Sequence, residues 1–282
     1  RKAQDAILNR NDEIVKQNSL LSVQQEVLTE KSLILDETIS YAKLIQDSIL
    51  FSPPSFLNIF TDYFICNRPK DSVSGDFCWF AYKSDSVVIA VGDCTGHNIK
   101  GGFNTLIANA LLTQIVNERD FGTPAEVLNE LQVKLQKLSK PHPDFPQGLR
   151  PNIKLAICQI NINSKRMMYA ATRTPLYIMQ NGKMKCIEAD THSVIEQADV
   201  TFQNQILQLK KGDKFMLFTD GYHKQIGGEE SEALGENALS QNLAQLADNG
   251  LPYIKEKVEE IFEQWKKDQP QTDDVLVFGL QV

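Results

Sequence analysis

Four aspartates far apart in the sequence each lie at the end of an apolar segment with the composition of a β-strand. They are Asp76 in Ser-Gly-Asp-Phe, Asp93 in Gly-Asp-Cys-Thr-Gly-His, Asp220 in Thr-Asp-Gly-Tyr and Asp273 in Gln-Thr-Asp-Asp. Three of them adjoin strand-like runs directly, at residues 87–91, 215–218 and 275–278. Carboxylates gathered at the ends of buried strands repel one another unless a cation lies between them. A hard divalent cation with oxygen ligands is the simplest such partner.

Residues 1–50 contain neither glycine nor proline, and an apolar residue recurs at every seventh position. The repeat runs through Ile7, Ile14, Leu21, Leu28, Leu35, Ala42 and Ile49. It predicts a long helix with one apolar stripe. The second seam position is mostly polar, as at Gln17 and Lys31. We therefore expect a marginal parallel coiled coil that forms a homodimer through residues 1–50; the alternative is a solvated helix docked on its own domain.

Composition restricts the class of protein. The chain has 282 residues, 42% of them hydrophobic and 23% charged, with a net charge of −7. This charge argues against a nucleic-acid or anionic membrane surface as partner. No apolar run approaches the roughly 18 residues that span a bilayer, and no signal peptide opens the chain.

The five cysteines form no C-x-x-C pair, so we expect reduced thiols and a cytoplasmic location. Because the first residue is Arg1, we expect a fragment of a longer protein.

A change of pattern after residue 52 predicts a second domain at 55–282. Ser52-Pro53-Pro54 ends the helix, since proline cannot continue it. Strands are expected at 62–68, 76–83, 86–92, 154–162, 166–171, 174–180, 206–210, 214–219 and 274–281. Helices are expected at 101–118, 123–138, 236–247 and 252–267, and a proline-rich loop at 139–152. Strands and helix pairs in this order predict an α+β fold with sheets enclosed by helices.

The aspartates suggest a specific chemistry. Two Mg²⁺ or Mn²⁺ ions that share a carboxylate can lower the pKa of a water held between them, and that water can attack phosphorus. Such a site requires no serine, cysteine or histidine nucleophile, and the sequence has no G-x-S-x-G elbow or P-loop. The alternative is that Asp-Gly and Asp-Asp are ordinary turn residues, although four such aspartates at strand ends weaken that interpretation.

Five ordered motifs resemble the SpoIIE-type branch of the metal-dependent protein phosphatase 2C family. They are Tyr41-Ala-Lys-Leu-Ile-Gln46, Arg68-Pro69 with Ser74-Gly-Asp-Phe77, Asp93-Cys-Thr-Gly-His97, Thr219-Asp-Gly-Tyr222 with Gln225-Ile-Gly-Gly228, and Gln271-Thr-Asp-Asp-Val275. The resemblance covers about residues 38–282. It implies an αββα sandwich, preceded by a long coiled-coil helix, that hydrolyses phosphoserine or phosphothreonine on a protein with two Mn²⁺ or Mg²⁺ ions.

The resemblance also implies a role for each acidic residue. Asp93 would bridge both ions, with the carbonyl of Cys94 as a further ligand. Asp220 and Asp273 would complete the shell of the first ion, and Asp76 would hold the second. Asp274 would be a neighbouring ligand.

The chain departs from the family pattern around the expected site. Asn98-Ile-Lys-Gly-Gly102 replaces Gly-Val-Pro-Gly-Ala, Pro151-Asn-Ile-Lys154 replaces Asp-Gly-Met-Asp, and Ala170-Ala-Thr-Arg173 replaces Ala-Gly-Ala-Asn. Lys224 stands where an aspartate is usual, and a lysine there would repel a third, loosely held ion. These changes add positive charge or volume while the four aspartates remain.

Other side chains are weaker candidates. Arg68, Lys70, Arg173 and Lys224 are candidates for phosphate contact, because cationic groups bind phosphate oxygens; a solvated surface charge is the alternative for each. His97 and His223 are near the aspartate motifs and are weak candidates for a functional role; an imidazole on the surface, or one that only contacts a site residue, is the alternative for both.

Three functions follow. The first is a metal-dependent serine/threonine protein phosphatase, the output module of a bacterial signalling protein. The resemblance implies a small phosphorylated regulator, such as an anti-sigma-factor antagonist, as its substrate. The second is a pseudophosphatase with weak or no activity that binds a partner through the same surface, suggested by Lys154 and Lys224. The third is a structural dimeriser in which the helix is the functional part.

Overall fold

The structure is a computed structural model that describes residues 2–50, 53–96, 98–118, 122–141, 151–195 and 201–282. It divides into two compact units, residues 1–44 and residues 45–282. Among these described residues, no helix combines the length and the hydropathy needed to cross a membrane.

The predicted long helix is confirmed as α1 (Lys2–Leu50). Its hydroxyl side chains are compatible with the helix because they hydrogen-bond to carbonyls one turn earlier, as Thr29 does to Gln25 at 2.8 Å. The apolar stripe is open to solvent in the single chain, with Leu21 54% and Leu28 67% exposed. Whether a second copy covers this stripe stays a prediction.

Residues 45–282 contain two five-stranded sheets. One has the order β1-β12-β9-β6-β7 and the other β2-β3-β4-β5-β8. The first consists of β1 (Asp62–Arg68), β12 (Val275–Gln281), β9 (Lys214–Phe218), β6 (Leu176–Gln180) and β7 (Lys183–Ile187). The second consists of β2 (Asp76–Lys83), β3 (Ser86–Cys94), β4 (Ile153–Asn161), β5 (Arg166–Ala171) and β8 (Gln205–Gln208). Neighbouring strands in both sheets are antiparallel.

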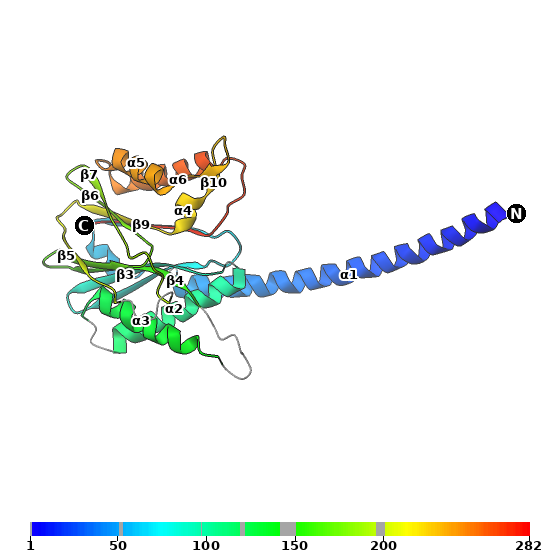
Figure 1. Ribbon diagram of the computed structural model, residues 1–282, viewed down its shortest axis with the longest axis horizontal. Coiled ribbons are helices and arrows are strands. Elements are labelled where there is room, and N and C mark those ends of the chain that lie inside the picture. The colour runs from blue at the N-terminus through cyan, green and yellow to red at the C-terminus, as the bar shows by residue number, and fades with distance from the viewer. Residues whose placement is uncertain (1, 51–52, 97, 119–121, 142–150, 196–200) are drawn as a thin grey trace. The chain divides into compact units, whose positions relative to one another are not determined.

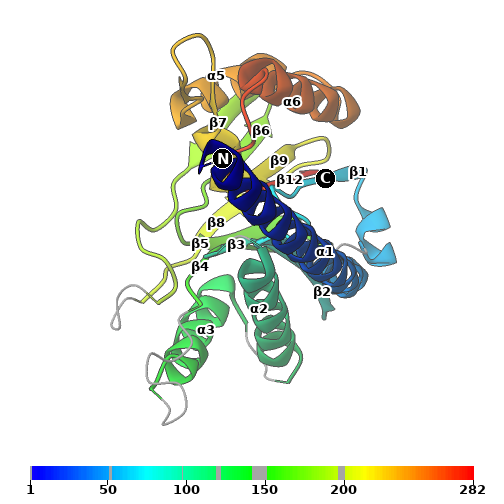
Figure 2. The same cartoon turned by 90° about the vertical axis from the view of Figure 1, so that its right-hand side faces the viewer.

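Helix pairs cover the outer faces of the two sheets. Helices α2 (Asn98–Glu118) and α3 (Pro124–Leu138) pack on the sheet that contains β3, whereas α5 (Glu236–Leu246) and α6 (Leu251–Lys266) pack on the other (Figures 1 and 2). The expected αββα sandwich is therefore confirmed. A capping box begins α3: the Thr123 hydroxyl accepts from the Glu126 amide, and Glu126 accepts from the Thr123 amide.

Three apolar layers hold this sandwich together. The central layer lies between the sheets and includes Ile89, Cys158, Phe215 and Phe278. Strand β3 is buried along nearly its whole length because both of its faces are covered, and this explains its continuous run of Val, Ile and Ala. Alternate residues of β3 and β4 therefore belong to different layers, and those that face the opposite sheet lead to the site described below.

Several short elements were not predicted. They are β7, the 3-10 helix at Ser55–Ile59, α4 (Asp220–Lys224), β10 (Ile226–Gly227) and β11 (Glu232–Ala233). Strand β7 reads Lys-Met-Lys-Cys-Ile and lies at a sheet edge, with exposed lysines in place of an apolar run. Most of the expected loop at 139–152 lies outside the described residues.

The C-terminal end of α1 is hydrogen-bonded to the segment that precedes Asp76. Gln46 is 2% exposed. Its amide nitrogen donates to the carbonyl of Ser74 at 2.7 Å and to the hydroxyl of Thr105, on α2, at 2.9 Å. The Ser74 amide donates back to Gln46 Oε1 at 2.9 Å. Gln46 thus joins α1, α2 and the start of β2.

Candidate functional site

The site begins as a row of three charged residues across neighbouring strands. Asp76 on β2 lies opposite Asp93 on β3, and Asp93 lies opposite Lys154 on β4. Cys78, Val91 and Ala156, two residues away along each strand, pack between the two sheets. Because side chains alternate between faces, the row lies on the face that points toward the opposite sheet.

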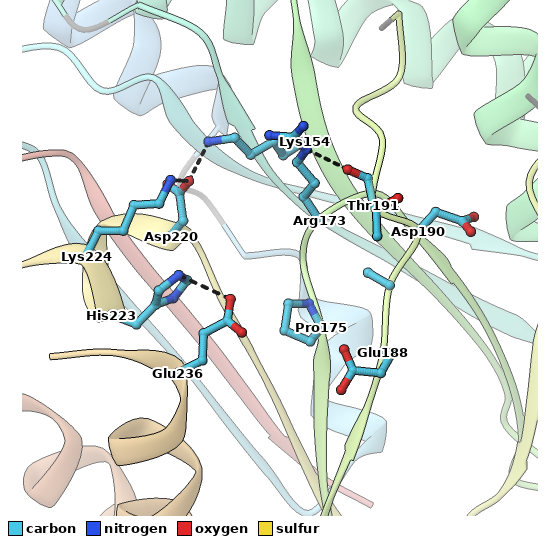
Figure 3. A pocket seen from close by; sticks show the side chains of 11 residues that line it. Lys154, Arg173, Pro175, Glu188, Asp190, Thr191, Asp220, His223, Lys224 and Glu236 are labelled. Carbon is cyan, nitrogen blue, oxygen red and sulfur yellow. Dashed lines mark hydrogen bonds and ion pairs between the residues drawn. The ribbon is translucent and has the colours of Figure 1, made fainter. Parts of the chain in front are cut away.

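The opposite sheet contributes Asp220, which begins α4 directly after β9 and Thr219. Lys154 Nζ lies 2.5 Å from Asp93 Oδ2 and 2.6 Å from Asp220 Oδ2. A second lysine, Lys224, approaches the same Asp220 oxygen at 2.5 Å from one helical turn away. Figure 3 shows the two lysines converging on Asp220. One ammonium group thus joins the two sheets through two carboxylates.

Asp76 is connected to the opposite sheet in another way. Its side chain is 1% exposed, and Asp76 Oδ2 accepts a hydrogen bond from the Thr219 hydroxyl at 2.7 Å. Thr219 Oγ1 also accepts from the Leu276 amide at 2.8 Å. The turn that follows requires glycine, because a Cβ at Gly221 would lie 1.9 Å from the carbonyl oxygen of Asp274. This close approach holds the Asp220 segment against Asp273 and Asp274.

The two C-terminal aspartates of the motif differ in their surroundings. Asp274 is 4% exposed, and its two oxygens accept the backbone amides of Lys70 and Gly75, each at 2.7 Å. Asp273 is exposed, and its Oδ1 accepts the Asp274 amide at 2.9 Å. The Cys94 carbonyl faces Gly75, where an added Cβ would lie 2.9 Å from that oxygen. Asp274 thus holds the loop before β2 in place. The predicted role as metal ligands stays a prediction for all six residues, namely Asp76, Asp93, Cys94, Asp220, Asp273 and Asp274.

The pKa shifts follow from burial and from the lysines. Burial, together with the charge of Asp93, raises the pKa of Asp76 well above its usual range. Burial raises the pKa of Asp93 to about 6, although the charge of Lys154 partly opposes this. For Asp220 burial acts in the same direction, but the hydrogen bonds and charges of Lys154 and Lys224 outweigh it and lower the pKa to about 2. Burial lowers the pKa of Lys154, but the acids outweigh it and leave the pKa raised. Lys154 is therefore charged, whereas no lysine or arginine pairs with Asp76 in the part of the chain that the structure describes.

The residues present do not fit the expected two-ion centre. Mg²⁺ binds carboxylate oxygens at about 2.1 Å, and one oxygen each of Asp93 and Asp220 already contacts the Lys154 ammonium at 2.5 and 2.6 Å. In the part of the chain that the structure describes, no three His, Cys, Asp or Glu side chains form a group that could hold a metal ion. The positive charge between these acids is supplied by the chain itself.

A cavity of about 340 Å³ opens beside this ion-pair cluster. Lys154, Arg173, His223, Lys224 and Glu236 are among its lining residues (Figure 3). Arg173 Nε donates to the Thr191 carbonyl at 2.8 Å, and His223 Nε2 lies 3.5 Å from Glu236 Oε1. Two of the four candidates for phosphate contact, Arg173 and Lys224, thus line one pocket.

The other two candidates for phosphate contact do not line this cavity. Arg68 pairs with Glu263 and lies over the ring of Phe262. Lys70 is exposed, and its backbone amide binds Asp274. His97 lies outside the described residues.

The sequence identified Lys154 as a departure from the family pattern but not as the partner of Asp93 and Asp220. Its contact with Asp93 depends on the register between β3 and β4, which aligns these two residues. A strand-pairing argument from the two apolar runs could have suggested the pair. The contact with Asp220 depends on how the two sheets pack, and no local signal in the sequence carries that information.

The family of the chain follows from a sequence comparison. The model of the family described as Stage II sporulation protein E (SpoIIE) matches residues 83–282, more than half of the chain. The chain belongs to the SpoIIE family. No curated protein sequence matches this SpoIIE-family chain.

Solved structures share the fold of this SpoIIE-family chain. The SiaA-PP2C domain of Pseudomonas aeruginosa is 24% identical with a TM-score of 0.78, over 89% of this chain and 98% of that one. The PP2C phosphatase domain of SpoIIE from Bacillus subtilis, with a fragment of its regulatory domain, is 16% identical with a TM-score of 0.63, over 78% and 63%. RsbX in complex with magnesium is 12% identical with a TM-score of 0.52, over 78% and 94%. At these identities the likeness establishes the fold, which is that of PP2C-type phosphatase domains.

Proposed function

We propose that this SpoIIE-family domain is a pseudophosphatase, a signalling module that binds a phosphorylated protein partner and has no hydrolytic activity of its own. The observation that supports this function is the Lys154 ammonium between Asp93 and Asp220. A two-ion mechanism needs these carboxylates as ligands of the ions that activate water. A covalently attached cation neutralises the same carboxylates and provides no such water.

The partner is inferred from the pocket and the family. Arg173 and Lys224 line the cavity beside the ion-pair cluster, and cationic groups of this kind bind phosphate oxygens. A small phosphorylated regulator, such as an anti-sigma-factor antagonist, is the partner that we propose. The proposed location is the cytoplasm.

The test is release of phosphate from p-nitrophenyl phosphate and from a phosphoserine peptide over a range of Mn²⁺ concentrations. We expect the wild-type chain to give no more phosphate than its Asp93→Asn variant, which serves as the control for contaminating phosphatases. Turnover by the wild type that rises with Mn²⁺ and disappears in Asp93→Asn would refute the proposal.

One observation favours the second candidate, an active Mn²⁺- or Mg²⁺-dependent serine/threonine phosphatase. Asp76 is buried opposite Asp93, and burial together with the Asp93 charge raises its pKa. A divalent cation near this pair would relieve the repulsion. In this candidate Asp76, Asp93, Asp220 and Asp273 would all be ligands. The phosphate-release assay discriminates between the two candidates, because only this one predicts a rate that depends on both metal and Asp93.

The remaining part of the proposal is the domain organisation. We assign residues 1–50 to a coiled-coil segment that forms a homodimer, and residues 55–282 to the phosphatase-like domain. The exposed leucines of α1 support the first assignment, because a stripe of this kind is stable in water when a second helix covers it.

A further inference from the structure

We propose that Lys154 is a tethered cation that replaces a divalent ion, and that removal of this one side chain opens a divalent-cation site between Asp93 and Asp220. The inference deepens the proposed function and rests on it, because it names the residue that makes the domain independent of metal. It also assigns different roles to the two lysines at the site.

The position of Lys154 in the fold is the first argument. Its neighbours on β4, Ile153 and Leu155, are fully buried in the layer against α2 and α3. The side chain of Lys154 therefore points the other way, toward the opposite sheet. There its ammonium reaches one carboxylate from each sheet, within 2.6 Å in both cases. The ammonium thus contacts a carboxylate from each sheet, as a metal ion with ligands from both sheets would.

The second argument is burial. The side chains of Lys154, Asp93 and Asp220 are only 20%, 17% and 10% exposed. Removing charges from water is costly unless each finds an opposite charge at short range. The ammonium and the two carboxylates satisfy one another in this way. Without Lys154, Asp93 and Asp220 would be left facing each other across the sheets, with Asp76 behind Asp93.

Lys224 provides the comparison within the same site. It binds the same Asp220 oxygen at 2.5 Å, but its side chain is 59% exposed. No contact between Lys224 and Asp93 is present among the described residues. An exposed ion pair of this kind contributes little to stability. Loss of Lys224 would leave the Lys154 bridge in place, so that Asp93 and Asp220 stay unavailable to an ion.

The experiment compares the full-length wild type with Lys154→Ala, Lys154→Met and the matched control Lys224→Ala. Mn²⁺ binding is measured by calorimetry, and the melting temperature is measured in EDTA and in excess Mn²⁺. Lys154→Met retains an unbranched apolar stem, so the charge is removed with little loss of packing.

We expect Mn²⁺ to bind to both Lys154 variants at least ten-fold more tightly than to the wild type and Lys224→Ala. Both Lys154 variants should melt below the wild type in EDTA and recover in Mn²⁺, because an ion that binds only the folded state stabilises it. Equal Mn²⁺ affinity in the wild type and the Lys154 variants would overturn the inference. Folded Lys154 variants that bind no Mn²⁺, or variants that stay unfolded even in excess Mn²⁺, would overturn it as well.

This experiment separates the inference from the proposed function. A wild type that binds Mn²⁺ as tightly as the Lys154 variants but releases no phosphate contradicts the inference and leaves the function standing. A wild type that releases phosphate without binding Mn²⁺ contradicts the function and leaves the inference standing.

Discussion

Single charged residues determine the electrostatics of the pocket, and Asp220 is the residue on which two of them converge. Its Oδ2 accepts from both Lys154 and Lys224. Asp220→Ala removes one of the two acids that compensate the mostly buried Lys154. We expect a loss of about 3 kcal/mol in the free energy of unfolding, at the lower end of the range for a broken buried pair because Lys154 keeps some contact with solvent.

The control for this prediction is Lys224→Ala, which breaks an exposed pair on the same aspartate and should cost about 0–1 kcal/mol. Urea unfolding followed by circular dichroism measures both variants. Equal losses for Asp220→Ala and Lys224→Ala would contradict the view that Lys154 is the important partner.

His223 gives a prediction for pH dependence. Burial lowers its pKa below the ordinary value of 6.5, although the charges of Glu236 and Asp220 oppose this and those of Lys224 and Lys154 assist it. The unfolded chain therefore binds a proton more readily than the folded one, so the contribution of His223 to stability is lost as the pH falls below about 6.5. Asp93 acts in the opposite direction, because its raised pKa of about 6 makes proton uptake stabilise the folded state.

We expect His223→Gln to lose less stability than the wild type between pH 7.5 and pH 5.5, because the variant keeps Asp93 and lacks the buried imidazole. Urea unfolding at the two pH values measures the difference, with His192→Gln, a histidine outside this cavity, as the control. An identical pH response of the wild type and His223→Gln would show that the imidazole does not contribute.

At this scale the sequence predicted that distant acids come together, but it did not predict that Lys154 contacts two of them. Asp76, Asp93 and Asp220 do meet at one junction. Their neutralisation by Lys154 depends on register and on sheet packing, which lie beyond any short stretch of sequence. The two oxygens of Asp274 accept backbone amides and hold a loop in place, and the expected role of Asp274 as a neighbouring ligand stays a prediction.

At the scale of elements, α1 carries the clearest prediction. If α1 pairs with a second copy, glutamates at Leu21 and Leu28 should separate the dimer, because both residues belong to the apolar stripe and are more than half exposed in the single chain. The matched control is Ser22→Glu with Thr29→Glu, which adds the same charge at positions one residue further along the helix.

Sedimentation velocity of the full-length chain tests this expectation. The wild type and the Ser22/Thr29 variant should be dimers, and the Leu21/Leu28 variant should be a monomer. A monomeric wild type, or a Leu21/Leu28 variant that stays dimeric, would contradict pairing through this stripe.

Strong periodic patterns made most elements predictable. The bounds of β1, β2 and β5 agree with the expected 62–68, 76–83 and 166–171. Strand β7 was missed because an edge strand can be rich in lysine. Helix α4 was missed because it has five residues, too few for a helical period to emerge.

At the scale of the whole chain, the alternation of strand runs and helix pairs predicted sheets enclosed by helices, and the family resemblance implied the αββα order; the structure confirms both. The order of strands and helices in the sequence could not predict which side chains contact each other between the two sheets. Thr219 reaches Asp76 across this interface, and Lys154 reaches Asp220. Both contacts lie at the same junction, where the expected site and the interface between the sheets coincide.

The Lys154 bridge also affects how the domain matures. A centre completed by a side chain forms in the same unimolecular step as the rest of the fold, with no uptake from solution. If Lys154 takes the place of the ions, the state of the site is fixed by the gene rather than by the manganese supply of the cell, and we expect neither chelators nor metal starvation to change it. Regulation would then act through the protein that docks on the domain.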